Sequence, residues 1–180
     1  MSRITIPSLD AAPAESRQIL DAVARQVGFV PNMFRLVSAS PAVLAGMSGL
    51  SGALAKTLDV KTRERIAIAI AEVNGCEYCL AAHTHLALNM AKMTPEEVAL
   101  NRNGGSSDPK AGAAVRFAVK VAETRGNVSD ADLQAVKDAG FSEAQVVEIV
   151  AAVAQNFFNN LVNNVARTDV DFPVQSAEAA

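Results

Sequence analysis

Two cysteines and two histidines, the only ones in the chain, all fall within ten residues, from Cys76 to His85. Cys76 and Cys79 form a Cys-x-x-Cys pair, and His83 follows four residues after the second cysteine. A thiolate is both a nucleophile and a redox centre, and an imidazole that titrates near neutral pH can accept a thiol proton and return it. The cluster therefore predicts a reactive dithiol.

Helical geometry separates the two histidines. Gly75 is typical of a helix end, so Cys76 is expected at the start of the next helix, where unpaired backbone N–H groups and the helix dipole favour a thiolate. At ~100° per residue, Cys76, Cys79 and His83 share an arc of roughly 60°, whereas His85 lies on the opposite face. His83 is therefore the candidate partner of the cysteines, and His85 is expected at the surface or in an interface.

A carboxylate that orients the imidazole, or moves its proton onward, would complete such a site. Glu64, Glu72 and Glu77 are the local options. Glu77 is expected to be solvated, and composition does not choose between Glu64 and Glu72. Since Glu64 lies between Arg63 and Arg65, a surface ion pair of small energetic value is its alternative interpretation.

Three interpretations of the Cys-x-x-Cys pair compete. A disulfide across so short a loop would remove little chain entropy, so a redox role explains the spacing better than a stabilising role. In the first alternative, Cys76, Cys79 and His83 bind zinc with Glu64 or water as fourth ligand, but structural zinc sites use four N or S ligands and no other cysteine exists. The second alternative is a buried pair without chemistry. We predict a redox dithiol that needs no bound metal or cofactor.

The elements that position these residues are expected to be helices. Helix-start signals recur along the chain: a proline after Asp108, capping boxes at 94–97 and 142–145, and Ser129 before an acidic turn. The alternation of Ile and Ala over 66–70 would also suit a strand, but Asp59 before it and Asn74-Gly75 after it favour a helix. The all-α prediction places helices at 10–27, 31–38, 41–56, 60–74, 77–91, 95–101, 109–125, 130–139 and 142–166.

The amino-acid composition excludes several classes of protein. The 180 residues are 50% hydrophobic, only 19% charged, and carry a net charge of −3, which gives no electrostatic footprint for nucleic acid or an anionic membrane. The low charge suggests a homo-oligomer. We expect one domain over residues 1–180 with extended N- and C-terminal segments, of which 175–180 should fray. With no signal peptide or membrane span in the sequence, a cytoplasmic location is expected.

Two further groups of residues lie outside this cluster. Five asparagines fall between residues 156 and 164, among large apolar side chains. They could line the site, but an amide network at a subunit interface is the preferred interpretation. Met33 and Phe34, which follow Pro31, are expected in the core or in the wall of a pocket.

Glu64, Cys76, Cys79 and His83 fit the pattern E-x(11)-C-x-x-C-x-x-x-H. This pattern resembles the signature of the alkyl hydroperoxidase D-like proteins of the carboxymuconolactone decarboxylase superfamily. The segments 27–41 and 159–173 resemble the peroxidase-related branch of that superfamily. The resemblance thus extends from near one end of the chain to near the other.

The resemblance implies an alkyl hydroperoxidase D-like helical bundle that assembles as a trimer or a larger multiple. It implies that Cys76 and Cys79 are the redox pair, that His83 is the relay imidazole and that Glu64 is the relay carboxylate. The expected activity is that of an antioxidant peroxidase acting on a peroxide or a partner disulfide. In the best-known branch a lipoyl-type dithiol reduces the enzyme and a peroxiredoxin receives the electrons, which makes both candidate partners.

One position departs from that branch, which has a histidine immediately before the second cysteine where this chain has Tyr78. A phenol is a poor proton acceptor at neutral pH but can donate a hydrogen bond. The electron donor and the peroxiredoxin of that branch are therefore not carried over with the motif. The alternative hypothesis is a non-redox, decarboxylase-like enzyme or binding protein on the same scaffold, although the decarboxylase branch lacks the cysteine pair.

Overall fold

The computed structural model describes residues 1–173, in which nine α-helices are joined by short connections and no strand is present. The predicted all-α fold is confirmed, while the expected fraying of 175–180 lies outside the described residues. The helices are α1 (Ala14–Val27), α2 (Asn32–Val37), α3 (Pro41–Leu54), α4 (Val60–Val73), α5 (Glu77–Asn89), α6 (Pro95–Arg102), α7 (Pro109–Thr124), α8 (Asp130–Asp138) and α9 (Glu143–Ala166).

The start of α1 is the one boundary that the sequence prediction misplaces by more than two residues. The helix begins at Ala14 rather than at residue 10, and Pro13 stands at its N-cap with extended backbone angles of φ −50° and ψ 141°. A proline disfavours helical backbone at the residue before it, so a helix cannot run smoothly through residues 10–12 into α1.

Side-chain caps begin several helices where the sequence predicts them. The box at the start of α9 is complete, with Ser142 and Gln145 each bonding the backbone of the other. At α6 the predicted box is only half formed. Thr94 accepts the backbone N–H of Glu97 at 3.2 Å, but the Glu97 carboxylate bonds Arg65 and the loop after α6 instead.

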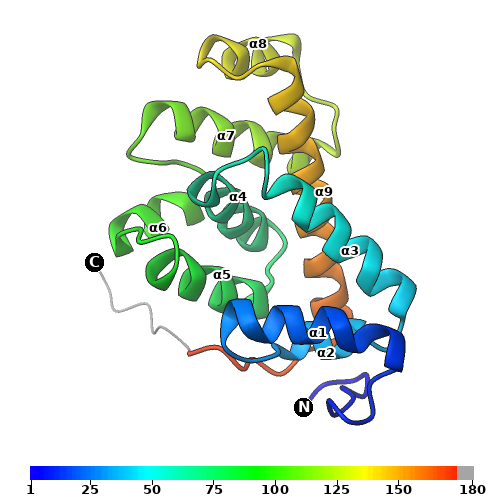
Figure 1. Cartoon of the computed structure of the whole chain (residues 1–180). Helices are drawn as coiled ribbons and strands as arrows, with labels where there is room; N and C mark the ends of the chain where they lie inside the picture. Colours follow the sequence, from blue (N-terminus) through cyan, green and yellow to red (C-terminus); the bar gives the residue numbers. More distant parts are fainter. Residues whose placement is uncertain (174–180) are drawn as a thin grey trace.

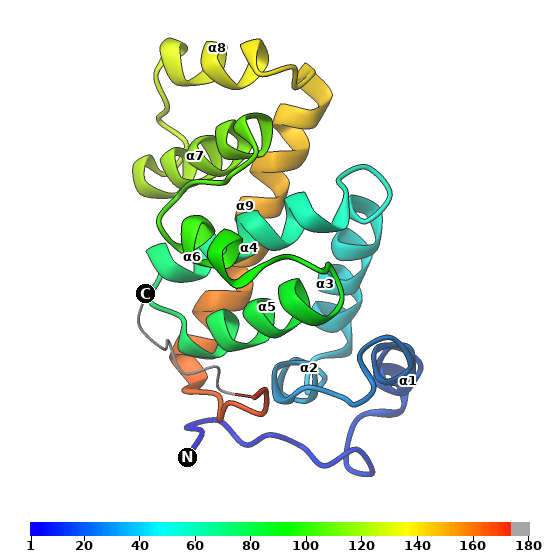
Figure 2. The same ribbon diagram turned by 90° about the vertical axis from the view of Figure 1, so that its left-hand side faces the viewer.

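Helix α4 lies at the centre of the bundle, packed against α5, α6, α7 and α9 (Figures 1 and 2). Each residue from 66 to 71 is at most 2% exposed. A helix that is buried on all sides needs no polar face, which explains why its Ile-Ala alternation imitates a strand. The prediction of a helix here is confirmed, and α4 becomes a rigid support for the charged residues of its first turns.

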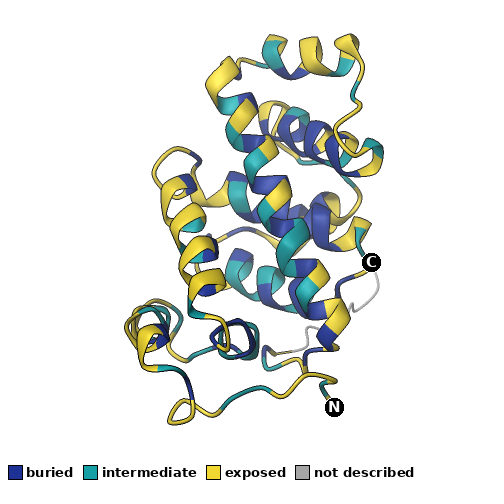
Figure 3. Cartoon of the chain, turned by 90° about the vertical axis from the view of Figure 1, so that its right-hand side faces the viewer, coloured by how far each residue is buried: buried dark blue, intermediate teal, exposed yellow. Residues whose placement is uncertain are grey.

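The remaining helices cover this centre, and their exposed faces point outward (Figure 3). In Figure 1, α7 and α8 close one end, α1 and α2 the other, and α9 runs along the bundle between them. The two terminal segments meet beside α2: the ammonium group of Met1 pairs with Asp169 at 2.9 Å, and the N–H of Arg3 donates to the carbonyl of Ala166 at 2.6 Å. No helix within residues 1–173 is long and apolar enough to cross a membrane.

Candidate active site

The turn between α4 and α5 places the cysteines. Gly75 adopts a positive φ of 58°, which a glycine reaches without steric cost, and the chain reverses there into α5. Cys76 is the N-cap of α5, and its Sγ accepts the backbone N–H of Cys79 at 3.3 Å. The predicted position of Cys76 at a helix start is thereby confirmed, with the sulfur itself serving as the cap.

The structure selects one carboxylate for His83. The Nδ1 atom of His83 lies 2.9 Å from Oε2 of Glu64, and the two side chains are only 21% and 11% exposed. Glu72 instead pairs with Arg102 at 2.7 Å on the surface, and Glu77 is exposed. The choice that composition left open therefore falls on Glu64.

The arginines beside Glu64 are engaged elsewhere. Arg65 pairs with Glu97 at 2.7 Å, and Nε of Arg63 donates to the backbone carbonyl of Leu58 at 3.2 Å. Within residues 1–173, His83 is the only ion-pair partner of Glu64. The interpretation of Glu64 as part of a surface ion pair is therefore wrong.

The surroundings of the two sulfurs drive their acidities apart. A hydrogen bond from the Cys76 thiol lowers the pKa of Cys79 against the opposing effect of burial, and the charge of His83 lowers it further, from about 9 to about 6. The same hydrogen bond, together with burial and the charge on Cys79, raises the pKa of Cys76. The lowered pKa thus falls on Cys79, and the expectation that the start of the helix favours a thiolate at Cys76 is wrong, because burial and the neighbouring Cys79 outweigh the position at the helix end.

Glu64 favours the protonated form of His83. Burial alone would lower its pKa, but the charge of Glu64 and the hydrogen bond to it outweigh burial and raise the pKa above its ordinary value of 6.5. Glu64 thus favours the protonated form of His83, and the positive charge on His83 favours the thiolate form of Cys79.

Helix α9 supplies amide groups to the sulfurs. Nδ2 of Asn163 donates to Sγ of Cys79 at 3.4 Å, and Asn160 acts on both cysteines in the same direction by lowering their pKa. The two side chains are 2% and 0% exposed inside this one chain. The preferred assignment of the asparagines to a subunit interface is therefore wrong for these two. The sequence pattern that could have located these two residues is their spacing: Asn156, Asn160 and Asn163 follow one another at intervals of four and three residues and so share one face of the helix.

Tyr78 binds away from the relay. Its hydroxyl donates to Oδ1 of Asp171 at 2.9 Å and accepts the backbone N–H of Met33 at 3.1 Å. Burial raises its pKa, so the phenol stays protonated and keeps its expected role as a donor. The ring of Phe172 packs against Tyr78 with centroids 6.0 Å apart. Asp171 and Phe172 lie in the segment 159–173 that carries part of the family resemblance, but sequence reasoning gave neither residue a role; their contacts with Tyr78 fix the segment after α9 over the site.

His85 faces away from the cysteines, as expected. It is half-buried, its ring lies 5.8 Å from that of Phe172, and its carbonyl accepts Nδ2 of Asn89 at 2.8 Å. Within residues 1–173, no three His, Cys, Asp or Glu side chains are grouped so that they could hold a metal ion.

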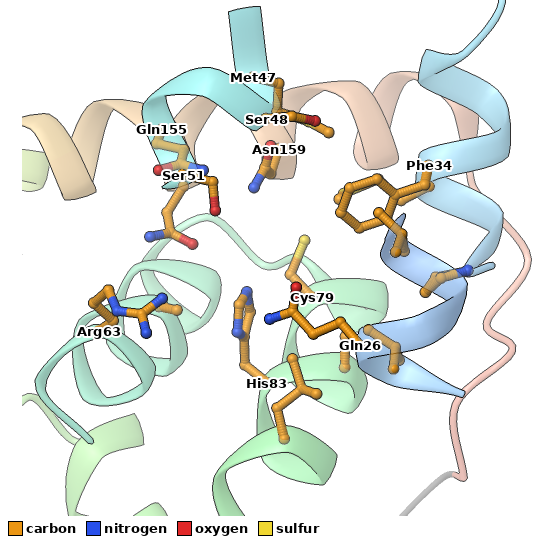
Figure 4. A pocket seen from close by; sticks show the side chains of 18 of the residues that line it. Gln26, Phe34, Met47, Ser48, Ser51, Arg63, Cys79, His83, Gln155 and Asn159 are labelled. Carbon is orange, nitrogen blue, oxygen red and sulfur yellow. The ribbon is translucent and has the colours of Figure 1, made fainter. Parts of the chain in front are cut away.

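A pocket of about 400 Å³ opens onto Cys79, His83 and Glu64 (Figure 4). Met33 and Phe34 line its wall, as the sequence predicted. Cys76 is not part of the lining and is fully buried. A small molecule in the pocket would therefore meet the thiolate first, while the second sulfur is protected behind it.

Replacing Glu64 with glutamine should raise the pKa of Cys79 by about one unit, equivalent to about 1.4 kcal/mol. Without the carboxylate, burial makes the His83 imidazole lose its proton, and the thiolate loses a neighbouring positive charge. The pH dependence of iodoacetamide alkylation, with the modified cysteine assigned by tandem mass spectrometry, measures this shift. Glu72→Gln, which removes an exposed carboxylate from the same helix, should leave the profile unchanged. Identical profiles for Glu64→Gln and the wild type would refute the relay.

Known proteins share both the motif region and the fold. The model of the carboxymuconolactone decarboxylase family matches residues 41–124, which include Glu64, Cys76, Cys79 and His83. An alkylhydroperoxidase AhpD core protein, a peroxidase-related protein from Ralstonia eutropha JMP134, has a similar structure with 28% identity and a TM-score of 0.84, over 94% of this chain and 92% of that chain. No curated protein sequence matches the chain.

Two more distant structures share the fold. A peroxidase-related protein from Silicibacter sp. TM1040 is 20% identical, with a TM-score of 0.81 over 93% of this chain and 91% of that chain. The debrominase Bmp8, in complex with 2,3,4-tribromopyrrole, is 18% identical, with a TM-score of 0.79 over 95% and 94% of the two chains. The helical bundle expected from the motif is confirmed by these likenesses.

Proposed function

Because residues 41–124 match the model of the carboxymuconolactone decarboxylase family and the whole fold resembles that of a peroxidase-related protein, we propose that the chain is a dithiol peroxidase that reduces an organic hydroperoxide. One observation carries the proposal: the sulfur with the lowered pKa, Cys79, opens into the pocket with the His83–Glu64 pair beside it. The fold alone does not establish a peroxidase activity, since a debrominase has the same fold. The thiol pair is what favours redox chemistry over the non-redox alternative.

In the first step, the Cys79 thiolate attacks the terminal oxygen of the hydroperoxide. The O–O bond breaks, Cys79 becomes a sulfenic acid, and the departing alkoxide takes the proton of the His83 imidazolium to leave as an alcohol. Glu64 stabilises the imidazolium before the transfer and orients the ring through Nδ1. The amide of Asn163 supports the negative charge on sulfur before the attack.

In the second step, the Cys76 thiol attacks the sulfur of the Cys79 sulfenic acid. A Cys76–Cys79 disulfide forms, and the hydroxyl leaves as water with the proton of the Cys76 thiol, which neutral His83 can relay. An external dithiol then restores both thiols by exchange and is itself oxidised to a disulfide. The resemblance to the alkyl hydroperoxidase D-like proteins makes a lipoyl-type dithiol the donor to test first.

The test is a stoichiometric oxidation followed by turnover. Fully reduced protein given one equivalent of cumene hydroperoxide under nitrogen should lose two thiols per chain, gain one intramolecular disulfide and release one equivalent of the alcohol. Steady-state turnover with dihydrolipoamide should exceed that with thioredoxin or glutathione. Thiols that remain free after mild hydroperoxide treatment would overturn the proposal in favour of the non-redox alternative.

A further inference from the structure

We propose that this pocket prefers hydroperoxides that carry a carboxylate, and that Arg63 binds that carboxylate. The inference rests on the proposed peroxidase function and specifies its substrate class. In the part of the chain that the structure describes, Arg63 is the only lysine or arginine that lines the pocket. It precedes Glu64 on α4 and is half-buried.

The guanidinium of Arg63 is held in place but not neutralised. Its Nε donates to the carbonyl of Leu58 at 3.2 Å, which fixes the base of the group. Within residues 1–173 its two terminal nitrogens make no hydrogen bond and the group forms no ion pair, whereas Arg65 and Arg102 both pair with carboxylates. A guanidinium can bind a carboxylate through two parallel hydrogen bonds, and both terminal nitrogens remain available for a ligand.

The pocket has a polar side and an apolar side, with the reactive sulfur between them. Figure 4 shows Arg63, Ser51 and Gln155 on one side of Cys79 and Phe34 on the other. The apolar part of the wall also includes Val27 and Met33. A ligand with its carboxylate at Arg63 and an apolar body toward Phe34 would therefore pass beside Cys79.

The negative charge of the Cys79 thiolate explains why an anionic substrate would need Arg63. The Cys79 thiolate repels an anionic substrate, and the charge of His83 is already shared with Glu64. An anionic hydroperoxide needs a further positive group to approach, and Arg63 supplies one. The pocket volume of about 400 Å³ lies toward the lower end of the range for small-molecule sites, which suits a single compact substrate.

The kinetic test compares cumene hydroperoxide with its para-carboxylate, which differs only by the charged group. The readout is the second-order rate constant for oxidation of the reduced enzyme in stopped flow. The wild type should prefer the carboxylate by about 10-fold or more. In Arg63→Gln this ratio should fall to about one or below, because only the thiolate's repulsion remains. Arg63→Lys, which keeps the charge without the planar fork, should retain part of the preference.

Arg116→Gln is the matched control, since it removes the same charge from an exposed position on α7 that does not line this pocket. Its substrate ratio should equal that of the wild type. A wild-type ratio near one, or a ratio that Arg63→Gln leaves unchanged, would overturn the inference while leaving the peroxidase function intact.

A binding measurement keeps the two proposals distinguishable. Calorimetry with 4-isopropylbenzoate, a carboxylate that cannot oxidise thiols, should show binding to the reduced wild type and to Arg116→Gln, and about 10-fold weaker binding to Arg63→Gln. If no hydroperoxide is turned over but this pattern holds, the peroxidase proposal fails and the carboxylate site stands. Equal affinities for Arg63→Gln and the wild type would reject the site.

Discussion

Replacing Cys79 with serine should lower the rate of hydroperoxide reduction by at least about 10³-fold, because a serine hydroxyl does not ionise near neutral pH and cannot act as a strong nucleophile. Replacing Cys76 with serine should leave the first attack largely intact, since a serine hydroxyl at the N-cap can still donate a hydrogen bond to the Cys79 sulfur. The two cysteines, three residues apart, would then have opposite mutational signatures.

Stopped-flow consumption of hydroperoxide and trapping with dimedone measure this difference. In Cys76→Ser the sulfenic acid on Cys79 has no resolving thiol, so the dimedone adduct should accumulate to nearly one per chain after a single turnover, and steady-state turnover should stop. In Cys79→Ser no adduct should form. Equal rates in the wild type and both variants would end the assignment of a redox site, and an adduct on Cys76 would reverse the roles of the two sulfurs.

Replacing Glu97 with glutamine should lower the free energy of unfolding by about 3 kcal/mol, because it leaves the largely buried guanidinium of Arg65 without its counter-charge. The side chains of Glu97 and Arg65 are only 7% and 13% exposed. The carboxylate also accepts hydrogen bonds from Ser106 and Ser107, which tie the loop after α6 to α4. The neutral variant would weaken both connections at once.

The stabilisation by Glu97 should depend on pH and should decrease in acid. Burial opposes ionisation of Glu97, but hydrogen bonds from Ser106 and Ser107 and from Arg65 outweigh it and hold the pKa of the folded state far below its ordinary value of 4.5. Because the folded-state pKa is lowered, the stabilisation is fully present above pH 4.5 and is lost as the pH falls toward the folded-state pKa.

Urea unfolding followed by far-UV circular dichroism, at pH 7 and at successively lower pH, measures this effect. The difference between the wild type and Glu97→Gln should be largest at neutral pH and should shrink below about pH 4.5. Glu96→Gln, one position earlier and exposed, should lower the free energy of unfolding far less than Glu97→Gln does at neutral pH. A difference between the wild type and Glu97→Gln that stays constant with pH would show that the charge is not the cause.

The helices could be predicted from the sequence because their signals are local. The Ser142–Gln145 box and the Asp59 cap act within one turn, and both begin helices in the structure. The same reasoning misread Glu97 as a capping side chain, since Arg65 lies 32 residues earlier in the chain and no local pattern links the two. It also started α1 too early by overlooking Pro13.

In the candidate site, too, the residues that are close in sequence could be predicted, whereas contacts between distant residues could not. The thiol pair and His83 lie close together in the sequence, and the spacing of the motif singles out Glu64 among the nearby carboxylates. The asparagine that donates to Cys79 lies 84 residues away, and Asp171, which bonds Tyr78, lies 93 residues away. Such contacts follow from how α9 and the segment after it pack on α5, which residue spacing along one helix does not encode.

This separation along the chain orders events during synthesis. A ribosome releases the N-terminal part first, so the two cysteines, His83 and Glu64 leave the exit tunnel long before α9 exists. Until α9 docks, the sulfur of Cys79 has no amide from Asn163 to support its negative charge. The hydrogen bond that Asn163 donates to Cys79 therefore forms only after the last helix has been made and has docked.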